Sequence, residues 1–420
     1  MTPAARLSAA IEILDLYGER QAAPSGARLE PILARWGREN RYAGSKDRAA
    51  IGDRAHDCVR RWQSYGAAMG ETGRGRVLAS LIAEGLSPSQ VEALFTGEGH
   101  APSPLTAEER AALAKTPAPA SDWPDWLLPE LERSVADPEA EIEALSRRAA
   151  ADLRVNSLKA TVEEARAALG AEGVEADPAP LSPIGLRLVA PRRLGGLAAF
   201  RDGLVEPQDA ASQAVALLGA AALREHEKPL ALDYCAGGGG KALALAAALG
   251  GRGDVIAHDV APERMADIPE RARRAGARID IARTPRDLEG CENRCDLVFV
   301  DAPCSGSGAW ARHPDEKWRL TPERLAAVRA AQRDALITAA RYVCAGGFLL
   351  YATCSLLACE NRDQADWFLG RGGHFQPEPL AAHWGAAGIM AAAPEGCAAA
   401  FTPAVHGADG FFLALFRCAG

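Results

Sequence analysis

Two cysteines stand directly after two apolar runs of the sequence. Cys304 lies in the turn 301–306, after the run 297–300, and Cys354 lies between Thr353 and Ser355, after the run 348–351. If both runs are neighbouring parallel strands of one sheet, about 4.8 Å apart, both thiols project into one cleft beyond the strand ends. A pair of thiols beside the carboxylate Asp301 is suited to covalent catalysis.

Methylation of carbon 5 of a cytosine is a reaction that needs this set of groups. A thiolate that adds to carbon 6 turns the ring into an enamine, whose carbon 5 can attack a methyl sulfonium. A base then removes the proton on carbon 5, and the thiol is eliminated. Asp301 is suited to bind N3 and the exocyclic amine, where it stabilises charge as the thiol adds. Inert buried cysteines, a disulfide, thiol-dependent hydride transfer and methylation of an amino group are weaker alternatives.

A glycine loop follows the first strand of the same region. It consists of Cys235, Ala236, Gly237, Gly238, Gly239, Gly240 and Lys241. Glycines let a ligand approach the backbone closely, and the helix that follows offers free N–H groups. A P-loop requires a glycine at position 235 and a hydroxyl at Ala242, which argues against a nucleoside triphosphate. NAD and S-adenosylmethionine both stay open, since Asp259, after the second strand, suits the ribose of either.

The apolar pattern divides the chain into three parts. Residues 1–118 repeat apolar side chains every three and four positions, which predicts an all-α domain. Residues 119–225 are a proline-rich linker and a small α/β subdomain. In residues 226–420 short strands alternate with helices, which predicts an α/β fold, a Rossmann-like domain with a mostly parallel sheet. A last strand after an irregular segment predicts an antiparallel C-terminal edge.

Composition narrows the class of protein. The 420 residues include 47 Lys and Arg against 55 Asp and Glu, a net charge of −8, so any contact with nucleic acid must be local. Residues 33–61 carry eight basic side chains and are either a solvated face or a phosphate-contacting surface. We expect a cytoplasmic monomer with no membrane segment, because no apolar run reaches about 18 residues. We expect no metal, because Cys291 and Cys295 have no second ligand pair.

Several segments of the chain, in order, resemble the RsmB/Sun-type RNA cytosine-5 methyltransferases. They are residues 154–159, 208–213, the glycine loop, 301–306, 313–318, 351–355 with Glu360 and Asn361, and 409–412. The resemblance covers about residues 120–420. It implies a Rossmann-like class I methyltransferase domain preceded by a small RNA-contacting subdomain. The first 115 residues, through 47–51 and 58–61, broadly resemble the NusB-type helical RNA-binding domain.

The resemblance implies a role for each matched residue. Cys354 is the nucleophile, Cys304 assists breakdown of the covalent adduct, and Asp301 and Pro303 contact the base. The family's S-adenosylmethionine is held by Cys235 to Lys241, Asp259 and Asp301, and Lys317 of the segment 313–318 contacts the substrate. The residues alone do not decide which thiol attacks.

The sequence departs from the family at two places near the expected cofactor. Gly237, Gly238 and Ala242 replace an alanine, a proline and a threonine of the family loop, and losing the proline makes the loop more flexible. The family's third-strand acid has only Asp280 and Asp287 as approximate substitutes, and we leave it unassigned.

The expected function is methylation of a cytosine in RNA, with ribosomal RNA favoured over transfer RNA and no role on DNA. The altered loop keeps a rival open: an RNA-binding or assembly protein that retains the fold with weak catalysis. A NAD-dependent oxidoreductase is the third reading.

Overall fold

The computed structural model describes residues 1–21, 26–113 and 120–419. The chain divides into two compact units, each built from separate stretches of sequence. The first unit comprises Met1–Pro129, Asp137–Arg148 and Trp310–Thr321, and the second comprises Glu130–Ala136, Ala149–Ala309 and Pro322–Gly420. The segment 310–321 therefore packs with the N-terminal helices, although its neighbours in sequence belong to the second unit.

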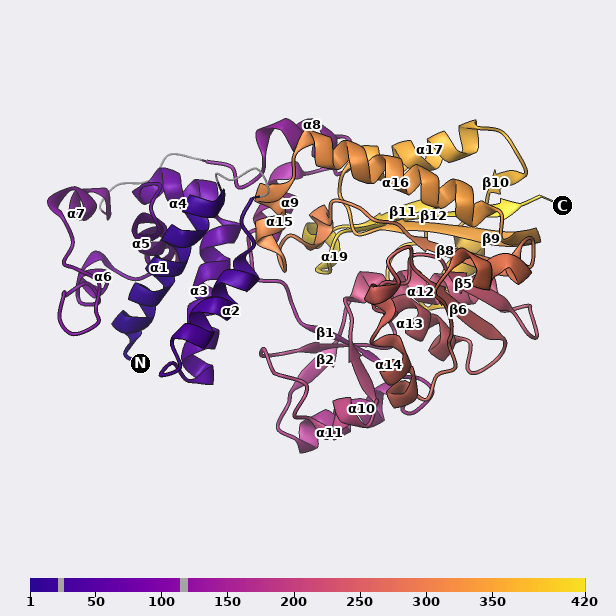
Figure 1. Cartoon of the computed structure of the whole chain (residues 1–420), viewed down its shortest axis with the longest axis horizontal. Coiled ribbons are helices and arrows are strands. Elements are labelled where there is room, and N and C mark those ends of the chain that lie inside the picture. The colour runs from indigo at the N-terminus through magenta and orange to yellow at the C-terminus, as the bar shows by residue number, and fades with distance from the viewer. Residues whose placement is uncertain (22–25, 114–119, 420) are drawn as a thin grey trace. The chain divides into compact units, whose positions relative to one another are not determined.

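The first unit is helical (Figure 1). Its helices are α1 (Pro3–Gln21), α2 (Leu29–Glu39), α3 (Ser45–Arg60), α4 (Trp62–Met69), α5 (Gly73–Ala83), α6 (Pro88–Glu92), α7 (Ala107–Leu113), η1 (Asp125–Leu127), α9 (Pro138–Leu145) and α15 (Pro314–Arg319). The apolar faces of α1, α3 and α5 form the core around Leu14, Val59 and Leu78. Ser87 starts α6 as the N-cap before Pro88, as the sequence predicts. Helix α8 (Leu128–Glu132) spans the boundary to the second unit.

The second unit contains a small antiparallel sheet. Its strand order is β2 (Ala176–Pro178), β3 (Gly185–Leu188), β1 (Asp152–Val155) and β4 (Val205–Pro207). Helix α10 (Val162–Ala171) begins at the Thr161 cap, and it packs on this sheet together with α11 (Ala198–Arg201). The stretch 119–225, in which a small α/β subdomain was predicted, thus contains an antiparallel sheet with helices packed on it.

The large sheet of the second unit is mostly parallel. Its strand order is β10 (Phe375–Pro377), β12 (Phe411–Cys418), β9 (Val343–Thr353), β8 (Cys295–Asp301), β5 (Leu230–Asp233), β6 (Asp254–His258) and β7 (Asp280–Ala282), with β11 (Ala398–Phe401) pairing β12. The strands from β9 to β7 run parallel, and β12 is antiparallel to β9. The predicted fold class and its antiparallel edge are confirmed.

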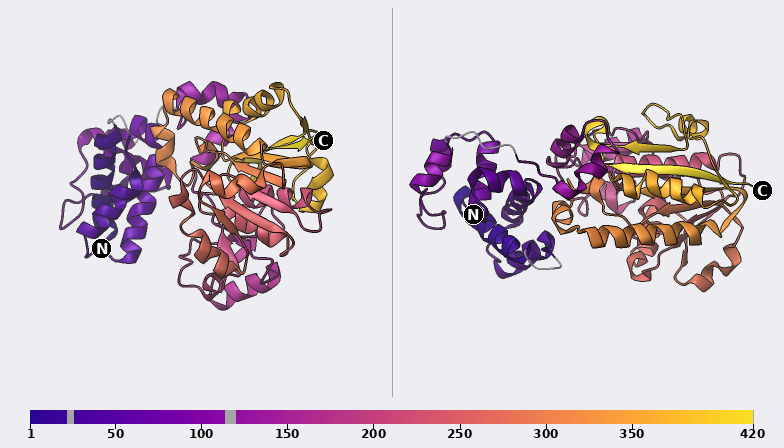
Figure 2. Two further views of the ribbon diagram at one scale, coloured as in Figure 1. Left: turned by 45° about the vertical axis from the view of Figure 1, so that its right-hand side comes forward. Right: turned by 90° about the horizontal axis from the view of Figure 1, so that it is seen from above.

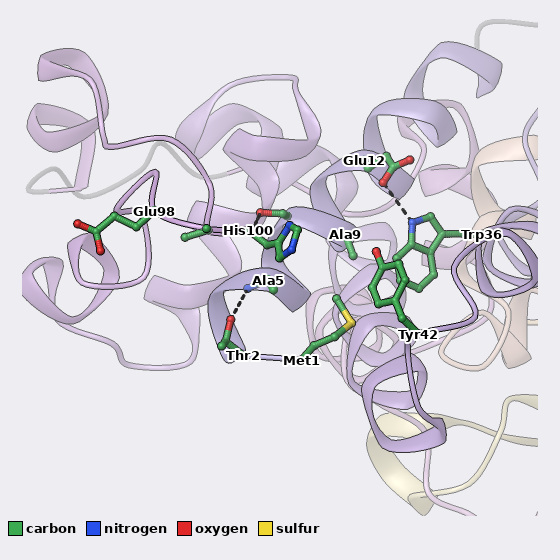
Figure 3. Close-up of a pocket in the computed structure, with 12 residues that line it drawn as sticks. Met1, Thr2, Ala5, Ala9, Glu12, Trp36, Tyr42, Glu98 and His100 are labelled. Carbon is green, nitrogen blue, oxygen red and sulfur yellow. Dashed lines mark hydrogen bonds between the residues drawn. The ribbon is translucent and has the colours of Figure 1, made fainter.

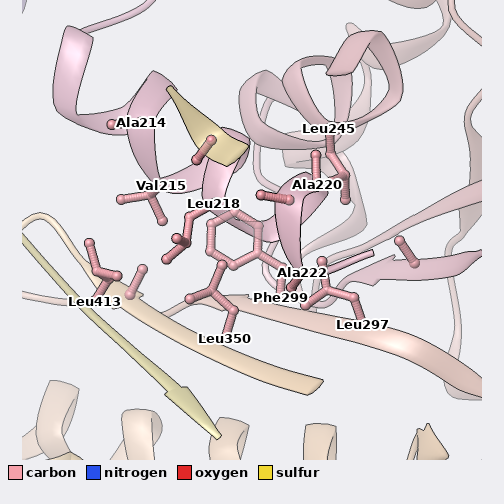
Figure 4. Packing of buried hydrophobic residues seen from close by; sticks show 14 of the residues in the cluster. Ala214, Val215, Leu218, Ala220, Ala222, Leu245, Leu297, Phe299, Leu350 and Leu413 are labelled. Atoms are coloured by element: carbon pink, nitrogen blue, oxygen red, sulfur yellow. The ribbon is translucent and has the colours of Figure 1, made fainter. Parts of the chain in front are cut away.

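Helices cover both faces of the large sheet (Figure 2). On one face lie α12 (Ala210–Ala222), α13 (Gly240–Ala248), α14 (Ile268–Ala275) and α18 (Ala381–Ala387); on the other lie α16 (Pro322–Ala340) and α17 (Arg362–Gly370). Along β8, Leu297 and Phe299 pack against α12 (Figure 4), whereas Val298 and Val300 belong to the cluster that contains Leu336 of α16. Both side-chain sets are buried, which explains why the strand reads as an unbroken apolar run.

Every helix among the described residues is too short or too polar to span a lipid bilayer.

Candidate active site

The sheet topology brings the two thiols together. β8 and β9 are parallel neighbours, with Asp301 opposite Ala352, so the loops after both strands start at the same edge. The Cys304 and Cys354 sulfur atoms lie 3.4 Å apart, and both side chains are partly exposed. From β5 the chain continues to β6 on one side of the sheet, and from β8 it continues to β9 on the other side. Open α/β sheets bind ligands at such a switch point between neighbouring strands.

The two sulfur atoms are not electrostatically equivalent. The hydrogen bond with Cys354, together with burial, raises the pKa of Cys304 well above its ordinary value. Cys304 therefore keeps its proton at neutral pH. Either sulfur can be the donor in this contact, so the geometry, like the residue spacing, does not decide which thiol attacks.

Asp301 is paired with the lysine of the glycine loop. The Lys241 ammonium, in the first turn of α13, lies 2.6 Å from Asp301 Oδ2 and 4.8 Å from the centre of the Phe411 ring. Burial acts to lower the pKa of Lys241, but the charge and the hydrogen bond of Asp301, together with smaller contributions from neighbouring groups, raise that pKa overall. The structure thus joins Asp301 to the loop residue Lys241, at the strand edge that also carries both thiols.

The glycine loop has a backbone conformation that suits glycine. Gly237 and Gly239 have φ angles of +50° and +77°, and a Cβ on Gly239 would lie 2.7 Å from Cγ1 of Ile268. The Gly237 N–H donates to Asp259 Oδ2 over 2.9 Å, so the loop is tied to the end of β6. The predicted loop and Asp259 therefore lie together at the carboxyl edge of the sheet.

Asp259 already has partners on both oxygens. Its Oδ1 accepts from the Ala261 N–H at 2.9 Å, and the Arg264 guanidinium lies 3.1 Å from its Oδ2. The Arg264 side chain is 59% exposed, so this ion pair is weak and can open. A ligand hydroxyl can reach the remaining lone pairs of Asp259 once Arg264 moves.

A buried carboxylate, Asp233, ends β5 beside this loop. It is fully buried, and neither oxygen has a hydrogen-bond partner of good geometry among the described residues. The backbone N–H of Ala242 acts to lower its pKa. Burial, and then the negative charge of Asp301, raise the pKa of Asp233 to about 7. A buried acid with unused hydrogen-bonding capacity marks a site that a ligand can complete.

Two acids considered for the third strand do not fill that position. Asp280 is exposed at the start of β7, opposite Ile256, and so lies at the amino end of the strand. Asp287 accepts hydrogen bonds from the N–H groups of Arg283 and Thr284 and thereby caps η3 (Pro285–Cys291). The residue that follows the carboxyl end of β7 is Arg283.

Lys317 belongs to a different compact unit from the other predicted site residues. It belongs to the first unit, is 2% exposed, and donates to the carbonyl oxygens of Arg60 at 2.9 Å and Asp122 at 2.5 Å. Burial lowers its pKa to about 7. The structure thus buries Lys317 in the packing of the first unit, and its contact with substrate stays a prediction. Pro303, by contrast, is exposed next to Cys304.

The basic residues between 33 and 61 serve several purposes. Arg54 pairs with Glu84, Arg61 pairs with Glu143, and the buried Arg60 donates to the Ala311 carbonyl. Arg38, Arg41 and Lys46 are exposed.

The first unit also has a pocket of about 800 Å³, with Trp36, Tyr42, Glu12 and His100 among its lining residues (Figure 3). Tyr42 is 71% exposed, and Trp36 donates through Nε1 to Glu12 over 3.1 Å. None of the predicted site residues lines this pocket.

The site analysis from sequence missed two residues that hold the thiol loops. Glu360 and Asn361 are buried and bond to the residues beside the cysteines. The resemblance included both residues but gave neither a role, because spacing alone does not show what a carboxylate or an amide will contact.

Comparison with known proteins adds a family to this geometry. Residues 220–417 match the model of the 16S rRNA methyltransferase RsmB/F family, and residues 123–194 match the RsmF/B-like ferredoxin-like domain. Ribosomal RNA small subunit methyltransferase B of Pasteurella multocida is 32% identical over 70% of this chain and 65% of its own length. Its namesake from Serratia proteamaculans is 32% identical over 59% of this chain and 58% of its own. The matches thus span less than two thirds of these curated relatives.

Solved structures show the same fold. The crystal structure of PH0851 aligns over 99% of both chains with a TM-score of 0.71 and 23% identity. NSun6 from Pyrococcus horikoshii, solved with SFG, aligns over 71% of this chain and 99% of its own with a TM-score of 0.61 and 19% identity.

Proposed function

Because this chain belongs to the RsmB/F methyltransferase family, we propose that it methylates carbon 5 of a cytosine in RNA through a covalent bond to Cys354. The observation that carries this proposal is the 3.4 Å separation of the Cys304 and Cys354 sulfurs beside Asp301. Ribosomal RNA is the substrate we favour, because the matched family model and the curated relatives are rRNA methyltransferases.

The proposed attack gives the two thiols different roles. As the resemblance implies, the Cys354 sulfur is the one that adds to carbon 6 of the ring, and it gives up its proton to solvent as it adds. As the sulfur–carbon bond forms, electrons move towards N3 and carbon 5, and Asp301 supports the N3 and amino edge of the base. Once carbon 5 carries the methyl group that the cofactor would supply, a base takes the proton from carbon 5, and the electrons of that C–H bond reform the C5–C6 double bond and expel Cys354 as a thiolate. Cys304 assists this release.

The residues of the glycine loop fit S-adenosylmethionine. A Cβ on Gly239 would collide with Ile268, so glycine lets the loop pack closely on α14, and the buried Asp233 at the end of β5 retains unused acceptors. Gly237 to Lys241 would hold the cofactor, with Asp259 at its ribose hydroxyls. When bound, the cofactor supplies an electrophilic methyl group. The lack of an acid after β7 predicts weaker binding than in family members that have one.

RNA contact in the first unit is proposed for a small surface. Arg38, Arg41 and Lys46 are exposed around Tyr42, and cations with an exposed aromatic ring bind single-stranded nucleic acid through phosphates and base stacking. Binding that depends on these cations weakens as salt rises.

The rival reading is an RNA-binding or assembly protein with weak catalysis, favoured by the altered glycine loop and by Arg264 on Asp259. Calorimetric titration with S-adenosylmethionine separates the two, since the rival predicts no measurable binding.

The test of the mechanism is a pair of cysteine variants assayed on unmodified small-subunit rRNA. Cys354→Ala should abolish methyl transfer while it still binds S-adenosylmethionine. Cys304→Ala should slow release, so that a denaturation-resistant RNA adduct accumulates on a gel. The partly exposed Cys418 is remote in sequence from both loops, and Cys418→Ala serves as the control that should behave as wild type. Methylation by Cys354→Ala would refute the proposed nucleophile.

A further inference from the structure

A single buried carboxylate, Glu360, bonds to both loops that carry the thiols. Glu360 ends the short helix η5 (Ala358–Glu360) and is fully buried. Its Oε1 accepts from the Ser305 N–H at 2.8 Å, and its Oε2 accepts from the Ser305 and Ser355 hydroxyls, the latter at 2.6 Å. Ser305 follows Cys304 and Ser355 follows Cys354, so Glu360 binds the serine that comes directly after each cysteine.

A third element joins the same carboxylate. Gln332, on α16, donates through Nε2 to Glu360 Oε1 at 3.0 Å and to the Pro303 carbonyl at 2.9 Å. Four donors thus converge on Glu360, which equals the number of lone-pair positions on an ionised carboxylate. Two of these donors are N–H groups, which can only donate. This arrangement matches the ionised form, although burial raises the pKa of Glu360.

A buried charge costs several kcal/mol unless hydrogen bonds compensate it, so a carboxylate at this place calls for a reason. Apolar packing would close the space between the loops without that cost. What a carboxylate adds is two oxygens that bind the loops after β8 and β9 at fixed distances. It also places a negative charge near Cys304, which contributes to the raised pKa of that thiol.

We propose that Glu360 is a positioning residue that sets the separation and the unequal roles of the Cys304 and Cys354 sulfurs by binding the serine next to each. It touches neither thiol and acts through Ser305 and Ser355. The inference rests on the proposed function, because it assigns Cys354 to attack and Cys304 to release.

The test is Glu360→Gln, which keeps the volume but replaces one acceptor oxygen with an NH2 group facing donors. We expect the single-turnover rate of methyl transfer to fall at least tenfold, because displacements near 1 Å at a reacting group cost about a hundredfold. The affinity for S-adenosylmethionine should stay within twofold. A denaturation-resistant RNA adduct should accumulate as in Cys304→Ala, since the releasing thiol is displaced. A residue with only a folding role would not produce that adduct.

Glu378→Gln is the matched control, because Glu378 is another poorly exposed carboxylate of the second unit and pairs with His383 at 2.9 Å. It should leave the rate and the adduct unchanged. If Glu360→Gln is poorly folded, Ser355→Ala can be tested in its place. This variant removes the hydrogen bond from the Ser355 hydroxyl to Glu360, and it should show the same adduct with a smaller loss of rate.

The outcomes separate this inference from the function beneath it. If wild-type protein forms no Cys354-dependent adduct and transfers no methyl group, the proposed function fails. If the wild type does both and folded Glu360→Gln matches it within twofold, only the role of Glu360 is refuted. The same conclusion follows if Ser355→Ala, tested in its place, lacks the adduct.

Discussion

Two groups of loops at the same edge of the large sheet are held in opposite ways. The thiol loops bond to the buried side chains of Glu360 and Asn361. Apart from the buried hydrogen bond of the Gly237 N–H to Asp259, the glycine loop is held from outside, by Arg271, which is 22% exposed and donates to the Gly238 carbonyl; Arg264, which is 59% exposed, pairs with Asp259. Buried bonds fix geometry before a substrate arrives, whereas exposed ion pairs can rearrange at little cost.

Because the two groups of loops are held differently, we expect substitutions in them to affect different properties of the protein. Substitutions behind the thiols should change the rate of reaction, and substitutions around the glycine loop should change cofactor affinity. The departures from the family pattern, at Gly237, Gly238 and Ala242, fall in the region held by exposed side chains. That region tolerates change because fewer buried bonds depend on it.

Asp233 provides the largest expected effect, because it is a buried acid on the glycine-loop side. Its pKa is 3.8 ordinarily and about 7 in the folded protein, so the folded state holds its proton more tightly than the unfolded state. Its contribution to stability is full below pH 3.8 and is lost as pH rises through about 7. Asp233→Asn removes this loss, on the order of 4 kcal/mol.

Urea unfolding of wild type and Asp233→Asn at about pH 4 and about pH 8 measures this effect. The variant should gain stability relative to the wild type at the higher pH only. Parallel pH profiles for the two proteins would show that Asp233 is not a buried titrating group.

The sequence predicted the parts of the site that follow from local pattern. The runs 297–300 and 348–351 are apolar because both faces of β8 and β9 are covered, and parallel pairing then places the residues after each strand at one edge. The meeting of Cys304 and Cys354 follows from those two facts. The helix cap at Thr161 and the antiparallel last strand likewise follow from local sequence patterns.

The rest depends on contacts between distant residues. Glu360 is bonded by Ser305 and Gln332, 55 and 28 positions away, and no periodicity in the sequence records such a meeting. Lys317 was expected to contact substrate because the segment 313–318 carries part of the resemblance. Its ammonium is buried on carbonyls of Arg60 and Asp122, since the segment 310–321 packs with the N-terminal helices.

Asn361 gives the next effect, on the thiol side. Its Oδ1 accepts from the Thr353 hydroxyl at 2.6 Å, and its Nδ2 donates to the Ser355 carbonyl at 2.8 Å, so it holds the residues on both sides of Cys354. Asn361→Ala leaves the buried Thr353 hydroxyl unpaired and should cost about 2–3 kcal/mol of unfolding free energy. Methyl transfer should fall more than S-adenosylmethionine affinity does. The exposed Gln376→Ala is the control, and equal stability of the two variants would contradict the prediction.

Gly239 gives the smallest effect and tests the other side of the comparison. Alanine there needs an unfavourable left-handed backbone at φ +77°, and its Cβ would lie 2.7 Å from the end of the Ile268 side chain, which must shift. Gly239→Ala should weaken S-adenosylmethionine binding about tenfold, or about 1.4 kcal/mol, as measured by calorimetry. Gly250→Ala is the matched control, because Gly250 has φ +62° with nothing within 4 Å of its Cβ position. The control shares the backbone strain but should bind the cofactor normally. Equal affinities for both variants would mean that this loop does not hold the cofactor, and its exposed arginine contacts would then have no bearing on cofactor affinity.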